Sequence, residues 1–250
     1  MTRYDIRTPR LYVDAPLGAG ATVKLETPQA HYLVHVLRLK AGDPVLVFNT
    51  REGEWRTSLA DVSKRTVSLA VEERMRDQPP PLDLHYLFAP LKHSRLDYLV
   101  QKAVEMGVSR LQPVMTRHTQ VARVNLERMR ANAIEAAEQC GVLTLPEIGA
   151  PTPLDRALAE RERSRLLVFC DEDAEVGNPI EALKGMAQGA GSASLAVLIG
   201  PEGGFAEEER AALLREPHVV RLALGPRILR GDTAAVAALA LVQAVFGDWR

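Results

Sequence analysis

Three consecutive prolines divide this 250-residue chain into two parts with different sequence patterns. Proline lacks a backbone donor, fixes φ, and pushes the residue before it toward extended backbone, so residues 78–82 are predicted to form a linker. The linker would separate an N-terminal domain of residues 1–77 from a C-terminal domain of residues 83–250. With 46% hydrophobic residues, the chain is suited to one large or two modest globular domains.

The residues before the linker are typical of a small β-barrel. Short runs of alternating or β-branched apolar residues recur there, and one helix is expected at about 29–37. The predicted strands are Arg10–Val13, Thr22–Glu26, Pro44–Phe48, Trp55–Leu59 and Thr66–Val71.

After the linker, strand-like and helix-like segments alternate, which predicts an α/β fold with a parallel sheet covered by helices. Helices are expected at about 95–106, 126–139 and 233–246, and the last is apolar nearly all round and should be buried. A segment rich in Gly, Ala and Ser, residues 185–194, predicts a flexible loop. The predicted strands are Leu84–Ala89, Arg110–Met115, Leu166–Cys170, Leu195–Ile199 and Val219–Leu224.

Two glycine-bearing turns near the C-terminus say most about function. The first, Leu198–Phe205, reads LIGPEGGF, and the second, Leu224–Arg230, reads LGPRILR. In α/β sheets, ligands bind where strand ends meet helix starts, and glycine lets the backbone approach them closely. Each turn alone is equally consistent with an ordinary strand-to-helix connection. Two of them so close in sequence predict one composite pocket.

The residues that flank the turns restrict the ligand. The helix after the first turn begins with three acids, Glu207–Glu209, and no Lys-Ser/Thr pair follows as in a phosphate-binding loop. This disfavours a phosphate and favours a group that is neutral or cationic there. The second turn offers apolar walls from Ile228 and Leu229, followed by polar side chains. An adenosine with a sulfonium tail suits that mixture.

Together the two turns resemble the S-adenosylmethionine (SAM) signature of the RsmE family, SPOUT-class methyltransferases that methylate N3 of a uridine in 16S rRNA of the small ribosomal subunit. The resemblance covers essentially the whole chain. It extends upstream through Pro9–Tyr12, His35–Arg38 with Gly42, Gln101–Val108, Glu135–Gln139 and Pro146–Ile148.

The resemblance implies an N-terminal PUA-like β-barrel for RNA and a C-terminal SPOUT-type parallel sheet with a trefoil knot. It also implies a homodimer whose interface adjoins the cofactor site, and uridine 1498 in the standard numbering as the target. The sequence departs from the family pattern at three places. Gly231-Asp232 stands where Thr-Glu is usual, Val142 where an Arg is common, and Ala206 where a Ser or Thr usually caps the helix.

The implied site residues fall into three groups. The cofactor-binding candidates are Leu198, Ile199, Gly200, Glu202, Gly203, Gly204, Leu224, Gly225, Ile228, Leu229, Arg230 and Thr233. The RNA-binding candidates are Arg3, Arg7, Arg10, Arg38, Lys40, Lys92 and Arg95. The catalytic candidates are Arg10, Arg230 and Asp232.

Uracil N3 carries a proton and becomes a good nucleophile only when that proton is lost, so the enzyme must accept it or stabilise the anion. Arg10 and Arg230 are expected to stabilise the anion and position phosphate, while Asp232 would orient Arg230 or receive the proton. Structural alternatives stay open: Arg10 as a solvated strand end, Arg230 paired with Asp232, and Glu202 capping its own turn.

Composition limits the other function classes. A net charge of −1 excludes a strongly basic, histone-like nucleic-acid binder, so any RNA surface must be local. The cysteines, Cys140 and Cys170, are expected to be reduced, buried thiols of a cytoplasmic protein, and the histidines show no metal-ligand spacing. No signal peptide is evident, and the longest apolar run, 234–246, falls short of the roughly 20 residues that span a bilayer.

Two other function classes remain as alternatives. A non-catalytic RNA-binding factor for ribosome assembly would retain the fold, and the Gly231-Asp232 departure is the feature that favours it. A nucleotide-phosphate hydrolase is disfavoured by the acidic helix start and the missing Lys-Ser/Thr pair.

Overall fold

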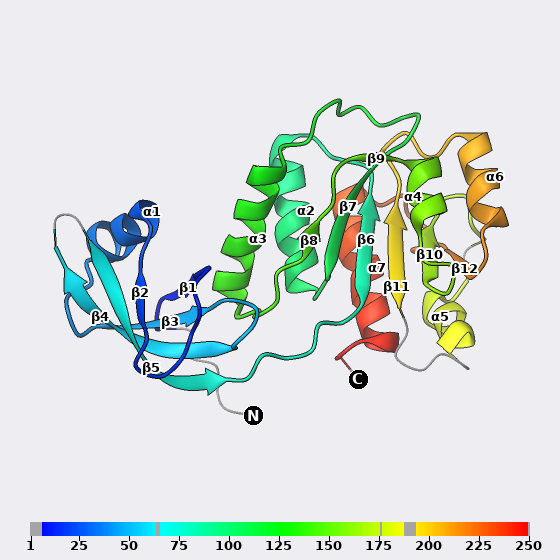
Figure 1. The fold of residues 1–250 in the computed structure, drawn as a ribbon. Helices are drawn as coiled ribbons and strands as arrows, with labels where there is room; N and C mark the ends of the chain where they lie inside the picture. Colours follow the sequence, from blue (N-terminus) through cyan, green and yellow to red (C-terminus); the bar gives the residue numbers. More distant parts are fainter. Residues whose placement is uncertain (1–6, 64–65, 176, 188–193, 250) are drawn as a thin grey trace. The chain divides into compact units, whose positions relative to one another are not determined.

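The computed structural model describes residues 7–63, 66–175, 177–187 and 194–249, and the chain forms two compact units (Figure 1). The first unit comprises the chain up to Pro80 together with Ala137–Leu145, and the second comprises Pro81–Ala136 and the chain from Pro146 onward. The sequence predicted one continuous segment for each domain. The structure instead brings a later segment of chain into the first unit.

Within the described residues, the first unit contains a five-stranded sheet in the order β1-β3-β4-β5-β2. β1 (Arg10–Tyr12) pairs in parallel with β3 (Pro44–Phe48), and the other pairs are antiparallel. All five predicted strands are present. The remaining strands are β2 (Thr22–Lys24), β4 (Glu54–Val62) and β5 (Val67–Arg76).

A short helical segment closes the core of the first unit. α1 (Thr27–His31) continues into a π-helical turn, Tyr32–Val36, which places Leu33 fully inside the core against Val45, Leu59 and other strand residues. The sequence predicted one regular helix over 29–37. The apolar residues that would favour it are present, but the backbone widens after His31.

The second unit is built on a parallel sheet, as predicted. In the described residues its strand order is β12-β10-β11-β6-β7-β8, and the short β9 (Thr152–Pro153) also pairs with β7. The central strands read as continuous apolar runs because both faces are covered by helices. The other bounds are β6 (Leu84–Phe88), β7 (Arg110–Met115), β8 (Glu147–Ile148), β10 (Leu166–Cys170), β11 (Leu195–Ile199) and β12 (Val219–Leu222).

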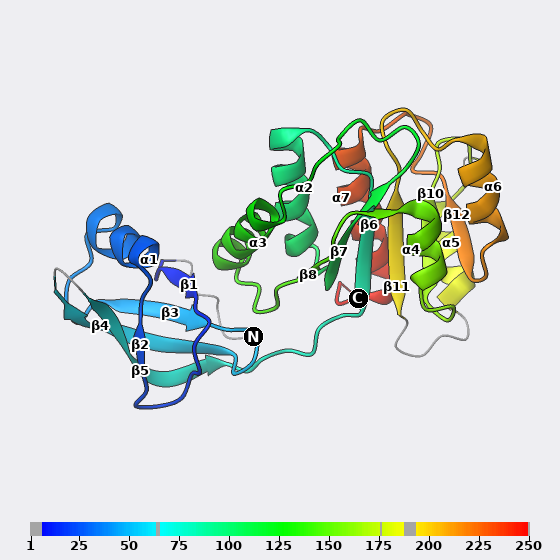
Figure 2. The same cartoon turned by 45° about the horizontal axis from the view of Figure 1, so that its top comes forward.

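Helices cover both faces of this sheet (Figures 1 and 2). On one face α7 (Gly231–Phe246) packs against α2 (His93–Glu105), α5 (Pro179–Ala187) and β11. On the other face α4 (Leu154–Glu160) packs with α6 (Glu207–Arg215). None of the helices in the described residues is long and apolar enough to span a membrane.

Two predictions about helices have different outcomes. The final helix is buried along one stripe that contains Ala238, Leu239 and Val242, whereas most of its other residues are partly exposed, so its predicted burial is confirmed in part. The loop predicted at 185–194 is wrong at its start, because α5 continues to Ala187, and residues 188–193 lie outside the described residues. The remaining helix, α3 (Leu126–Cys140), contacts α2 through an ion pair of Arg128 with Asp97.

Candidate active site

The carboxyl ends of β10, β11 and β12 surround a pocket of about 430 Å³. Both glycine turns line it, the first through Ile199–Glu202 and the second through Leu224–Arg230. Of the predicted cofactor set, Leu198, Gly203, Gly204 and Thr233 are not part of the lining. The sequence missed other lining residues, namely Cys170, Asp171, Glu172, Pro201, Leu222, Ala223, Pro226, Arg227, Gly231 and Ala234.

Glycine is required at several positions of these turns. A Cβ at Gly200 would approach the ring of Phe205 to 3.0 Å or less, and Phe205 is a buried core residue. Gly204 and Gly225 have φ values of +69° and +96°, which side-chain-bearing residues rarely adopt. The backbone shape that forms the pocket wall therefore depends on these glycines.

The first turn is also attached to the loop that follows β7. The Nδ1–H of His118 donates to the carbonyls of Gly203 and Gly204, at 3.2 and 3.0 Å. Glu209 accepts hydrogen bonds from the backbone N–H groups of Ala206 and Arg117, at 3.0 and 2.8 Å. Ala206 supplies no side-chain cap, as its sequence predicts, and Glu209 reaches back only to the N–H of this N-cap residue.

One arginine on α2 connects the two glycine turns. The Nε of Arg95 donates to Oδ2 of Asp232 at 2.9 Å, and its Nη2 donates to Oδ1 at 3.2 Å. Its Nη1 pairs with Glu202 of the first turn. Two of the structural alternatives do not occur. Asp232 pairs with Arg95 rather than with Arg230, and Glu202 pairs with Arg95 instead of capping its own turn. Arg95, a predicted RNA contact, is thus engaged by two carboxylates, and neither Arg95 nor the catalytic candidate Asp232 lines the pocket itself.

These contacts determine the ionisation of Asp232. Hydrogen bonds from Arg95 outweigh partial burial and hold the pKa of Asp232 below its ordinary value. A general base near neutral pH needs the opposite shift. The electrostatics of the site therefore favour Asp232 as an ionised anchor for Arg95 and for the start of α7.

Arg230 has a different environment. It is exposed at the start of α7 and lines the pocket, and within the described part of the chain its guanidinium makes no ion pair. The neighbouring Ile228 is 91% exposed at the rim of the same pocket. The second turn thus presents an available cation and a bare apolar side chain.

Asp171, which follows β10, is a pocket residue that the sequence analysis missed. Its side chain is fully buried and pairs with Arg221 at 2.7 Å and Arg210 at 3.1 Å. An acidic residue directly after a buried strand was the signal that could have found it.

Burial raises the pKa of the adjacent Cys170 to about 12, so this thiol is unreactive. The expected burial of Cys140 is wrong, because Cys140 is exposed.

Arg10 lies in the first unit and is only 7% exposed. Its Nε donates to Glu54 at 2.5 Å, and Glu54 also accepts from Arg76 Nε at 2.7 Å. Burial would raise the pKa of Glu54, but the two arginines outweigh it and hold that pKa below its ordinary value. Arg10 is therefore a buried residue with a structural partner, and the alternative that it is a solvated strand end is wrong.

The other RNA-binding candidates are dispersed. Arg7, Arg38 and Lys40 are exposed in the first unit, Lys92 is exposed at the start of α2, and Arg3 lies outside the described residues. Arg38 has a φ of 59°, in the left-handed region. Their contact with RNA stays a prediction.

A parallel α/β sheet with a two-turn glycine pocket at its strand ends, in a chain that also carries a small β domain, is the architecture of an enzyme that binds a nucleotide-like cofactor. The model of the RNA methyltransferase domain matches residues 78–243, and that of the RNA methyltransferase PUA domain matches residues 25–72. The chain therefore belongs to the RsmE family of RNA methyltransferases, as the sequence motifs indicated.

Relatives and solved structures agree with this assignment. Ribosomal RNA small subunit methyltransferase E from Rickettsia conorii is 28% identical over 94% of each chain, and the Synechocystis protein of that name is 31% identical over 94% of this chain and 77% of its own. The Neisseria gonorrhoeae enzyme of that name, solved with S-adenosyl methionine, is 26% identical over 98% of this chain and all of its own, with a TM-score of 0.83. A putative methyltransferase from Legionella pneumophila, solved with SAM, is 28% identical over 95% and 98%, with a TM-score of 0.79.

Proposed function

We propose that this protein uses SAM to methylate N3 of one uridine, position 1498 in the standard numbering, in 16S rRNA of the small ribosomal subunit. The observation that carries the proposal is the single pocket lined by both glycine turns, in a chain of the RsmE family. Solved relatives that hold SAM support the choice of cofactor.

The residues of the pocket fit SAM. Apolar side chains of Ile199, Leu224 and Leu229 would hold the adenine, and backbone groups beside Gly200 and Gly225 would contact the polar edges of the nucleoside. The carboxylate of Glu172 suits its positively charged groups. When bound, SAM supplies an electrophilic methyl group on a sulfonium.

The protein's own residues would prepare the uracil. Arg230, an available cation at the pocket, would stabilise the N3 anion or position an adjacent phosphate. Asp232, held ionised by Arg95, would fix the start of α7 and thereby the position of Arg230. For Arg10 we propose a structural contribution through its buried pair with Glu54.

We further propose a homodimer whose interface adjoins the pocket, a trefoil knot formed by the last part of the sheet and α7, and a cytoplasmic location. The substrate would be the small subunit or a late assembly particle. The exposed Ile228 at the pocket rim supports a partner surface there, since a bare apolar side chain beside a ligand pocket is costly unless something covers it.

Mass mapping of small-subunit rRNA from cells that lack this gene tests the proposal. The N3-methyluridine is expected to disappear and to return with the wild-type gene but not with Arg230→Ala. If the modified nucleotide persists in the deletion strain, the assignment fails.

Calorimetry with SAM and with ATP tests the ligand separately. Tight binding of SAM without binding of ATP is expected. A protein that binds rRNA but not SAM would instead be the non-catalytic assembly factor.

A further inference from the structure

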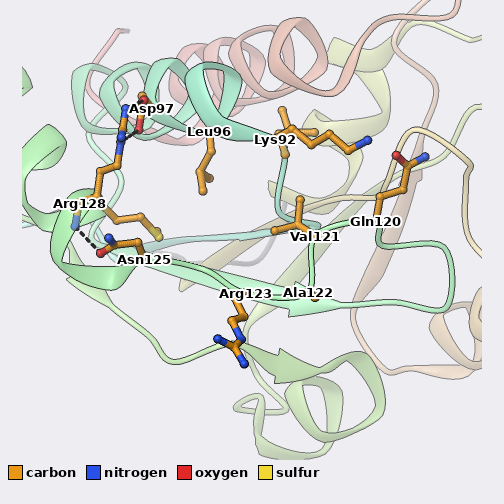
Figure 3. A pocket seen from close by; sticks show the side chains of 11 residues that line it. Lys92, Leu96, Asp97, Gln120, Val121, Ala122, Arg123, Asn125 and Arg128 are labelled. Carbon is orange, nitrogen blue, oxygen red and sulfur yellow. Dashed lines mark hydrogen bonds and ion pairs between the residues drawn. The ribbon is translucent and has the colours of Figure 1, made fainter.

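A second cavity, of about 460 Å³, lies at the amino end of α2 and is built from a different set of residues. Figure 3 shows Leu96 and Asp97 of α2, with Lys92 just before this helix, at one side, the segment Gln120–Arg123 across from them, and Arg128 of α3 at the end. Its volume lies within the range of about 300–1,000 Å³ that is usual for ligand sites.

The charges around this cavity favour an anionic ligand. The carboxylate in the cavity lining, that of Asp97, already accepts hydrogen bonds from Arg128 at 2.6 Å and from the amide of Asn132 at 2.8 Å. Lys92 and Arg123 make no ion pair within the described part of the chain. Figure 3 shows Lys92 extending toward Gln120, while Arg123 projects at the opposite edge. Two available cations therefore stand at separate edges of the cavity.

The lining between these cations includes apolar side chains beside the polar Gln120 and Asn125. Leu91 and Met129 are buried, and Leu96 and Val121 are partly exposed to the cavity. An apolar surface flanked by cations suits a nucleobase with a phosphate on either side, because bases bind through their faces and phosphates through Lys and Arg.

The second cavity is connected to the glycine-turn pocket through two contacts. Leu91 packs on Gly231, a lining residue of that pocket, so closely that a Cβ there would lie 3.4 Å from the Leu91 side chain. The segment that supplies Gln120 and Val121 follows His118, which is bonded to the first glycine turn. An occupant of the second cavity would thus be a near neighbour of the ligand in the first.

We propose that this cavity binds a nucleotide of the substrate RNA adjacent to the uridine that is methylated. The base would lie on Leu96 and Val121, and the flanking phosphates would contact Lys92 and Arg123. This inference rests on the proposed function and gives it a second RNA contact beside the pocket. Because N3 lies on the pairing edge, the target must leave its base pair, and a held neighbour would keep the strand open.

Steady-state kinetics and equilibrium binding of unmethylated small ribosomal subunits test the inference. For Lys92→Ala/Arg123→Ala we expect KM for the subunits to rise about tenfold and the salt dependence of binding to fall by about two counterions, one for each cation removed. The Kd for SAM should stay unchanged. Arg163→Ala is the matched control, because Arg163 is an exposed arginine at the amino end of β10 and should change neither value.

Val121→Trp tests the apolar part without changing charge. Filling the cavity should weaken subunit binding while leaving its salt dependence and the Kd for SAM as in the wild type. Unchanged subunit binding by both variants would overturn the inference. So would a change of sedimentation from dimer to monomer in either one, since the cavity would then be a protein contact.

The same measurements separate this inference from the function on which it rests. A wild-type protein that methylates rRNA while both variants bind subunits normally ends only the inference about the cavity. A wild-type protein that binds SAM and subunits but transfers no methyl group ends the proposed function.

Discussion

Replacing Arg95 by alanine tests whether one guanidinium holds the two glycine turns in their binding arrangement. Arg95 and Asp232 form a two-point ion pair whose side chains are 31% and 18% exposed, whereas Glu202 is 47% exposed. A charge-assisted pair of this partial burial contributes about 1–2 kcal/mol, and the more exposed pair at most about 0.5 kcal/mol. Arg95→Ala should therefore weaken SAM binding by about 2 kcal/mol, or roughly thirtyfold in Kd.

A double-mutant cycle with Asp232→Ala isolates the pair. If Arg95 and Asp232 act together, calorimetry should give a coupling of about 1 kcal/mol between the two substitutions. Lys102→Ala, which removes an ion pair with Glu105 further along the same helix, should leave the Kd for SAM unchanged. Additive effects of the Arg95 and Asp232 substitutions would refute the reasoning, because the two turns would then be held independently.

Three further substitutions have defined outcomes. Glu54→Gln should destabilise the first unit by about 3–5 kcal/mol in urea unfolding, against less than about 1 kcal/mol for Glu73→Gln, because Glu54 is buried between arginines and Glu73 is exposed. Since the folded pKa of Glu54 is lowered, the stability that its carboxylate contributes should disappear as pH falls through that pKa. Equal losses of stability in Glu54→Gln and Glu73→Gln would contradict the role given to burial. Gly200→Ala should displace Phe205 and abolish measurable SAM binding, and retained affinity would show that the turn can adapt. Burial lowers the pKa of His85 from 6.5 to about 4, so wild-type stability should fall by about 3 kcal/mol as pH drops across that window, and His85→Gln should remove this loss.

The regular elements of the sheet were predictable from local pattern. Runs such as Leu195–Ile199 are apolar throughout because helices cover both faces, and the glycines of the following turn mark where the backbone must bend. β8 and β9 were not predicted. Each is two residues long, and β9 ends in a proline, so no periodic signal exists.

The long-range charge pairs could not be predicted from local sequence pattern. Arg95 and Asp232 are 137 positions apart, and Arg10 and Glu54 are 44 apart, so the fold rather than sequence spacing brings them together. The nearby Arg230 was the more natural partner for Asp232 by spacing. Asp232 pairs with Arg95 because α2 and α7 pack together, which brings the first turn of α2 next to the start of α7.

The return of the chain to the first unit affects how the protein is made. Arg76 donates to the carbonyl of Gly141 at 3.0 Å, and the backbone N–H of Tyr12 donates to Glu138 at 2.8 Å. When Pro80 leaves the ribosome, these partners do not yet exist. At about 5–20 residues per second, roughly 3–13 seconds of synthesis pass before Leu145 follows. The N-terminal unit is thus first in the gene, yet it finishes folding only after part of the second has been translated.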